Sequence, residues 1–226
     1  MAKINQELRD LEIFEIDLLD HLNTIRVIEK LFFGGGTMLR LCHNLNRYST
    51  DLDFWLKPEI NVDKLFNNLL SSLSNKYEII DSANKKFTIL FQIRSRVSKR
   101  SLKIEIRKNQ KNFEWERKIA FSKYSTKQVQ VLGLTLKQMM NNKIEALLSR
   151  KIIRDCFDID FLFKRGIPLP NDNETLNKML KIIDSFGDKD FKVTLGSLLD
   201  EEERELYKQI KFDALRTEVV GMIKTN

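Results

Sequence analysis

The chain has 226 residues, of which 42% are hydrophobic and 31% are charged. This composition is typical of a folded globular protein and excludes a disordered chain. Two cysteines and two histidines are too few for a disulfide framework or a Cys/His metal cluster. The formal net charge of +7 favours a polyanionic partner.

Residues 1–7 lack the apolar core of a secretion signal, and no apolar run in the chain reaches the length of a transmembrane helix. We therefore expect a cytoplasmic protein that does not bind a membrane. The length leaves room for one large domain or two small ones.

The first helix is predicted over residues 5–31, where apolar side chains recur every three or four positions. A glycine-rich turn, residues 34–36, follows, and a second helix is predicted from about Thr37 to Asn44. Glycine lets the backbone approach an anion closely, and a helix N-terminus presents free N–H groups. This turn is therefore a candidate phosphate-binding site.

A strand is predicted over residues 51–56, where Asp51 and Asp53 alternate with Leu52 and Phe54. On a strand, both carboxylates project to one face while the apolar pair packs behind them. Two carboxylates on one face suit Mg²⁺, and a nucleotide held by the glycine turn would be the metal's other ligand. The alternative is an ordinary turn followed by a solvated strand face.

The middle of the chain predicts one helix and three strands. The helix covers residues 61–75, and the strands cover 77–81, 87–93 and 101–107, with turns at 84–86 and 98–100. The second strand is almost entirely apolar, which suits a strand buried on both faces.

The strand over 101–107 alternates strictly, so Lys103, Glu105 and Arg107 share the face opposite the core. Glu105 is therefore a candidate third carboxylate. The alternative is that Glu105 only pairs with Lys103 or Arg107 on an exposed face.

The segment from Arg94 to Lys118, which we call the basic region, contains ten Lys or Arg and three Glu, with Phe113 and Trp115 among them. Basic side chains neutralise phosphates and aromatic side chains stack on unpaired bases. The basic region is therefore the candidate RNA-contact surface, and a solvated charged face is the alternative.

The last part of the chain predicts helices after one short strand over residues 128–132. Thr135, with Gln138 three residues later, forms a capping box that begins a helix ending near Arg150. A further helix is predicted over 153–162, before a break at 166–170. After the break, helices are predicted from Asn171 or Asp172 to 186 and from Asp200 to about 224.

The pairing of Gly35-Gly36-Thr37 with Asp51-Leu52-Asp53 resembles the nucleotidyltransferase superfamily with the DNA polymerase β-like fold. The segment Arg-Tyr-Ser-Thr-Asp-Leu-Asp-Phe over residues 47–54 is similar, more narrowly, to the AbiEii family of nucleotidyltransferase toxins of type IV toxin–antitoxin systems. Downstream, Lys-x-x-Ala-Leu-x-x-Arg over 143–150 and Arg-Asp-x-x-Asp over 154–158 match motifs of that family in kind and order. The resemblance covers about residues 31–165.

The resemblance implies an α+β fold. A polymerase β-like nucleotidyltransferase core, with a mixed β-sheet and flanking helices, would occupy residues 1–132. A helical region that completes the active site would occupy residues 133–226.

The resemblance also implies the roles of the site residues. Asp51, Asp53 and Glu105 would be catalytic and would hold Mg²⁺, as two ions, with Mn²⁺ as an alternative. Lys143 would contact the phosphates of the nucleotide, and Asp155 or Asp158 would shape the site or orient neighbouring arginines. An ordinary amphipathic helix pair with surface ion pairs is the alternative for these last residues. The expected nucleotide-binding residues are Gly35, Gly36, Thr37, Arg47, Ser49, Lys143, Asp155 and Asp158.

The activity so implied is transfer of a nucleoside monophosphate from an NTP to an acceptor hydroxyl, with RNA or tRNA as acceptor and an antitoxin protein as the separately encoded partner. A protein or a small molecule is the alternative acceptor. A catalytically inactive module of the same fold that binds RNA or a partner is the alternative that is not an enzyme.

Overall fold

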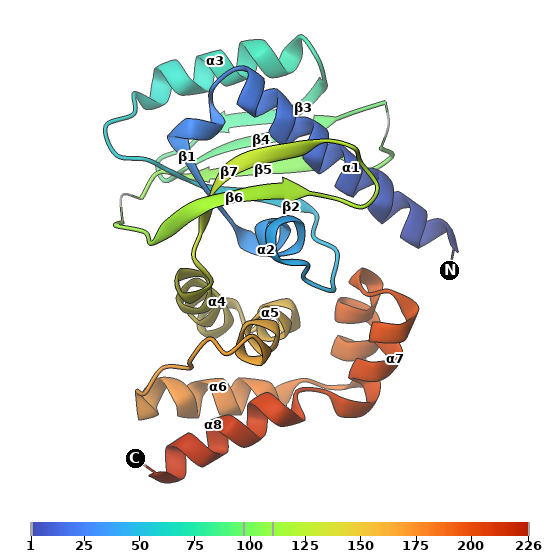
Figure 1. Cartoon of the computed structure of the whole chain (residues 1–226), viewed down its shortest axis with the longest axis vertical. Helices are drawn as coiled ribbons and strands as arrows, with labels where there is room; N and C mark the ends of the chain where they lie inside the picture. Colours follow the sequence, from blue (N-terminus) through green and yellow to red (C-terminus); the bar gives the residue numbers. More distant parts are fainter. Residues whose placement is uncertain (1, 97, 110, 226) are drawn as a thin grey trace. The chain divides into compact units, whose positions relative to one another are not determined.

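The computed structural model describes residues 2–96, 98–109 and 111–225. It divides into two compact units, Met1–Leu134 and Thr135–Asn226. Each unit has its own core, and the boundary falls at the end of the last strand. Figure 1 shows the strands in the first unit and helices in the second.

The first unit is built on one mixed seven-stranded sheet with the order β3-β4-β5-β2-β1-β7-β6. β2 pairs with β5 and β1 with β7 in parallel, and the other neighbours are antiparallel. Its elements are α1 (Ala2–Thr24), η1 (Ile28–Lys30), β1 (Leu31–Gly34), α2 (Gly35–His43), β2 (Asp51–Leu56), α3 (Val62–Ser74), β3 (Glu78–Asn84), β4 (Thr88–Arg94), β5 (Leu102–Arg107), β6 (Trp115–Phe121) and β7 (Gln128–Leu134).

The expected helix over 5–31 is wrong at its C-terminal end. α1 ends at Thr24, Arg26 adopts a left-handed φ of 54°, and β1 begins at Leu31. β1 contains four residues, all of them buried, so its apolar run is too short to show a period that separates strand from helix.

Two further expectations for the sheet need correction. β4 alternates buried and half-buried side chains instead of being buried on both faces, and Phe87 before it is 70% exposed. β6 was not expected at all. It is an edge strand whose Trp115, Ile119 and Phe121 are exposed, so its apolar residues do not mark a core face.

Over residues 135–225, which the structure describes, all regular elements of the second unit are helices. They are α4 (Leu136–Arg150), α5 (Ile153–Lys164), α6 (Asn173–Ser185), a π-helical turn η2 (Asp190–Leu195), η3 (Gly196–Leu198), α7 (Glu201–Ile210) and α8 (Asp213–Thr225). None of the described helices has both the length and the apolar character that a membrane span requires.

The predicted helix starts in this unit are confirmed where a side chain caps them. The Thr135 hydroxyl accepts a hydrogen bond from the Gln138 backbone N–H at 3.1 Å, and Asp172 accepts from the N–H groups of Glu174 and Thr175. The expected single helix from Asp200 is two helices, because Lys211 adopts a positive φ of 47° that cannot continue a helix.

Candidate functional site

The three candidate carboxylates lie on the two central parallel strands, β2 and β5. Their register pairs Asp51 with Lys103 and Asp53 with Glu105. These side chains are half-buried, whereas Leu52 and the other residues that alternate with them are buried in the core. The alternation predicted for both strands is therefore confirmed, and it places the three acids on one face of the sheet.

The glycine turn packs directly against β2. Gly35 has a φ of +74°, and a Cβ added to it would collide with Asp53 Oδ2. A Cβ on Gly36 would collide with Arg47 Nη2 and would lie 2.9 Å from Ser49 Oγ. Gly35 therefore requires glycine, because its φ is positive and an added Cβ would lie 2.8 Å from the Cβ of Asp53, whereas the nearest neighbour of Gly36 is the flexible end of Arg47. The turn brings both glycines together with Asp53, Arg47 and Ser49.

Thr37 follows the glycines in the first turn of α2 and is completely buried. Its hydroxyl donates a hydrogen bond of 2.7 Å to the backbone carbonyl of Asp51. The resemblance implies a contact between this hydroxyl and the triphosphate. In the structure, the hydroxyl joins the start of α2 to the start of β2 and so positions Asp51.

Behind Thr37 lies a buried acidic residue that the sequence analysis did not identify. Glu15 of α1 is 1% exposed, and its Oε1 lies 3.4 Å from the Thr37 hydroxyl. Burial raises the pKa of Glu15 well above its usual value, and the charge of nearby Glu12 adds to this effect, while Arg40 opposes it. The signal in the sequence was two glutamates, Glu12 and Glu15, within the apolar stripe of the predicted first helix.

Glu12 forms an ion pair with Arg40. Its carboxylate accepts hydrogen bonds from Arg40 Nε and from the Ser122 hydroxyl, each at 2.5 Å. The Arg40 guanidinium also lies over the Tyr48 ring, 3.9 Å from its centroid. This buried polar network fixes α1 against the segment that connects α2 to β2.

Glu105 carries both of the ion pairs that the alternative interpretation proposed. Lys103 Nζ donates to Glu105 at 2.7 Å, and Arg107 Nε lies 3.4 Å from the same carboxylate. Burial opposes ionisation of Glu105, but the hydrogen bond and charge of Lys103, together with Arg107, outweigh it, so the pKa of Glu105 lies below its usual value. Arg107 also lies 3.5 Å from Asp53 Oδ1.

The oxygen donors on this face suit a hard divalent cation. Within the described part of the chain, no three His, Cys, Asp or Glu side chains gather closely enough to hold a metal ion. Mg²⁺, however, is commonly held by one or two carboxylates together with substrate phosphates. Asp51 and Asp53, beside a glycine turn at a helix N-terminus, fit that mode of binding.

In the second unit, the motif residues of α4 and α5 form a buried ionic cluster. Lys143 Nζ lies 2.6 Å from Asp158 and 3.4 Å from Asp155, and both aspartates are almost completely buried. Arg150 binds Asp155 through Nε and Nη2 at 3.0 and 2.8 Å. The alternative of weak surface pairs is therefore wrong for Lys143, whose pairs are buried, whereas the side chain of Arg150 is 49% exposed.

The basic region does not form one surface. Arg94 and Lys103 lie on β4 and β5, whereas Arg117 and Lys118 lie on β6, and three strands separate β5 from β6. Lys108, beyond the C-terminal end of β5, binds the side chain of Asn84 at 2.5 Å. Among the residues of the basic region that the structure describes, those near the start of β5 are the ones that adjoin Asp51.

A mixed sheet with a glycine turn against an Asp-x-Asp strand, and a third acid on the next strand, defines a nucleotidyltransferase fold. Two crystal structures from Helicobacter pylori share this fold. JHP933 is 22% identical with a TM-score of 0.53, covering 92% of this chain and 95% of its own. A candidate nucleotidyltransferase is 21% identical with a TM-score of 0.53, covering 90% and 96%.

The family model for the nucleotidyl transferase AbiEii toxin of type IV toxin–antitoxin systems matches residues 17–224. The chain therefore belongs to the AbiEii family and is a nucleotidyltransferase, as the resemblance implied. Membership of this family implies an NTP substrate and an antitoxin partner. A search of curated proteins found no match.

Proposed function

We propose that this protein is a Mg²⁺-dependent nucleotidyltransferase that moves a nucleoside monophosphate from an NTP to a hydroxyl of RNA, with tRNA as the expected acceptor. Pyrophosphate is released, and the protein acts in the cytoplasm as the toxin of its pair. The observation that carries the proposal is the register that sets Asp53 beside Glu105 while the glycine turn closes on Asp53.

In this proposal, some of the site residues bind the metal and others bind the nucleotide. Asp51 and Asp53 would hold the metal, and Glu105 would join them by exchanging its pair with Lys103. Two Mg²⁺ ions, or Mn²⁺ in their place, would supply Lewis-acid chemistry that activates the acceptor hydroxyl and offsets the charge of the leaving pyrophosphate. The side chains on this face would form no covalent bond with the substrate, so they would act by orienting the substrates and by stabilising charge.

The backbone N–H groups at Gly35 and Gly36 would bind the triphosphate at the start of α2, with Arg47 and Ser49 beside them. Thr37 and Glu15 are positioning residues in this proposal, because they act through Asp51. Following the family motif, Lys143 would add a positive charge for the nucleotide phosphates, and Asp155 and Asp158 would keep its ammonium in place.

The test is transfer of label from each common NTP, labelled at the α-phosphate, to total cellular RNA in the presence of Mg²⁺. The control is the double variant Asp51→Ala/Asp53→Ala. Label in an RNA band with the wild type alone supports the proposal and names the nucleotide. Label in protein or in small products would keep the catalytic site and replace the acceptor. Absence of any transfer would contradict the proposal and favour an inactive binding module.

A further inference from the structure

A pocket of about 520 Å³ opens at the edge of the sheet where β4 ends and β2 and β5 begin. Four basic side chains and one candidate catalytic carboxylate line it: Arg94, Lys99, Arg100, Lys103 and Asp51. We call this the basic pocket. Its volume lies within the range of small-molecule sites and can accommodate part of a nucleotide.

Lys103 is already paired with Glu105 at 2.7 Å, and the other three cations of the basic pocket are available to an anion. Arg94 pairs with Glu78 at 3.2 Å and Arg100 with Glu7 at 3.6 Å, and both arginines are about half exposed. Exposed pairs of this kind contribute little, so a phosphate can replace the glutamate on either guanidinium. Lys99 is exposed and forms no ion pair with any residue that the structure describes.

The lining also supplies neutral hydrogen-bonding groups. Gln92 Nε2 donates to the Ser101 hydroxyl at 2.9 Å, and both residues line the pocket. One arginine guanidinium can donate two parallel hydrogen bonds to two oxygens of a phosphate. Neighbouring amide and hydroxyl groups can donate to the remaining oxygens. This chemistry favours an anion with several oxygen acceptors, such as a phosphate, over a neutral ligand.

The position of the pocket separates it from the nucleotide side of the site. In the strand order β4-β5-β2-β1, the basic pocket lies on the β5 side of β2, and the glycine turn follows β1 on the other side. Asp51 and Asp53 therefore have an anion site on each flank. This arrangement suits a transfer between two substrates that both carry phosphates.

We propose that the basic pocket binds a backbone phosphate of the acceptor RNA strand, adjacent to the hydroxyl that receives the nucleotide. This inference rests on the proposed function and deepens it, because it requires an acceptor that carries a phosphodiester next to its reactive hydroxyl. A small cationic acceptor would be repelled by the same four basic side chains.

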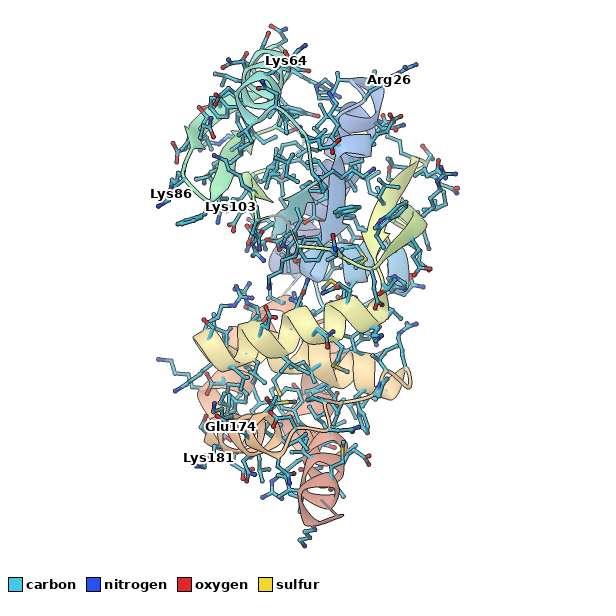
Figure 2. The ribbon with its side chains drawn as sticks, turned by 90° about the vertical axis from the view of Figure 1, so that its left-hand side faces the viewer. Arg26, Lys64, Lys86, Lys103, Glu174 and Lys181 are labelled. Carbon is cyan, nitrogen blue, oxygen red and sulfur yellow. The ribbon has the colours of Figure 1, made fainter. Side chains whose placement is uncertain are left out.

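The test uses the full chain and a short fluorescein-labelled single-stranded RNA, without NTP, so that binding is measured apart from turnover. Arg94→Ala/Lys99→Ala removes two cations from the pocket. Arg26→Ala/Lys64→Ala removes the same charge from exposed positions of the first unit that Figure 2 shows well away from Lys103. Anisotropy is followed across a salt series, and stabilisation by NTP with Mg²⁺ is measured in parallel.

We expect the pocket variant to bind RNA on the order of tenfold more weakly and to reduce the salt slope by about 0.7 for each RNA phosphate that is no longer neutralised. The control variant should keep most of the affinity, and NTP stabilisation should be unchanged in both. Equal weakening in the two variants, no RNA binding by the wild type, or loss of NTP stabilisation in the pocket variant would each overturn the inference. The label-transfer assay decides the proposed function separately.

Discussion

At the scale of single residues, a buried acid, Glu15, lies behind the proposed site. Glu15 supports Thr37, whose hydroxyl holds the carbonyl of Asp51. Its pKa is raised, so the folded state favours the neutral carboxyl. Stability from the neutral form is therefore complete below the usual value of 4.5 and is lost as pH rises towards the raised folded-state pKa.

Glu15→Gln removes this titration while keeping the size of the side chain. We expect the variant to match the wild type in urea unfolding at acid pH and to become the more stable of the two as pH rises above 4.5. Glu29→Gln removes a charge from an exposed side chain and is the matched control. A gain for Glu15→Gln that is the same at every pH would contradict the raised pKa.

At the scale of elements, the junction of β1 and α2 requires glycine for two separable reasons. Gly35 has a positive φ and lies against Asp53, whereas Gly166 has a φ of +78° with nothing within 4 Å of an added Cβ. Both alanine variants should lose about 1–2 kcal/mol of unfolding free energy through backbone strain. Only Gly35→Ala should also displace the Asp53 carboxylate.

Label transfer therefore separates the two reasons. We expect Gly35→Ala to lose activity by much more than its loss of stability explains, and Gly166→Ala to retain activity at a temperature where it is folded. Comparable activities in the two variants would show that contact between the turn and β2 is unimportant for the reaction.

Prediction also succeeded and failed at this scale for physical reasons. The alternation in β2 and β5 and the caps at Thr135 and Asp172 are local signals, so these elements were predictable. β1 was too short to show a period, and β6 is an edge strand whose exposed apolar residues hide the core face. The split of the basic region follows from strand order, which no local pattern contains.

At the scale of the whole molecule, the proposal predicts that nucleotide and metal stabilise the fold together. With Mg²⁺ and NTP at a hundred times the Kd, we expect about 2.7 kcal/mol of stabilisation in thermal unfolding. The effect should disappear when a chelator replaces Mg²⁺ and in Asp51→Ala/Asp53→Ala. Stabilisation that persists in the double variant would show that these carboxylates do not hold the metal with the nucleotide.

The sequence by itself determined the class of this protein, because its motifs are short and contiguous. Gly35-Gly36-Thr37, Asp51-x-Asp53 and the Lys143 to Asp158 segment were enough to name the family that the comparison with the family model then confirmed. The candidate residues in the first unit were likewise visible as residue types at regular spacings.

Only the tertiary structure decided what those residues contact. It directed the Thr37 hydroxyl to Asp51, placed Glu15 behind it, and buried the Lys143 cluster. It also placed the basic region on strands that are not neighbours, so that one part of the region lines a pocket beside Asp51. Spacing along the chain determines which face of an element a side chain occupies, but strand order and packing between elements determine what that side chain meets.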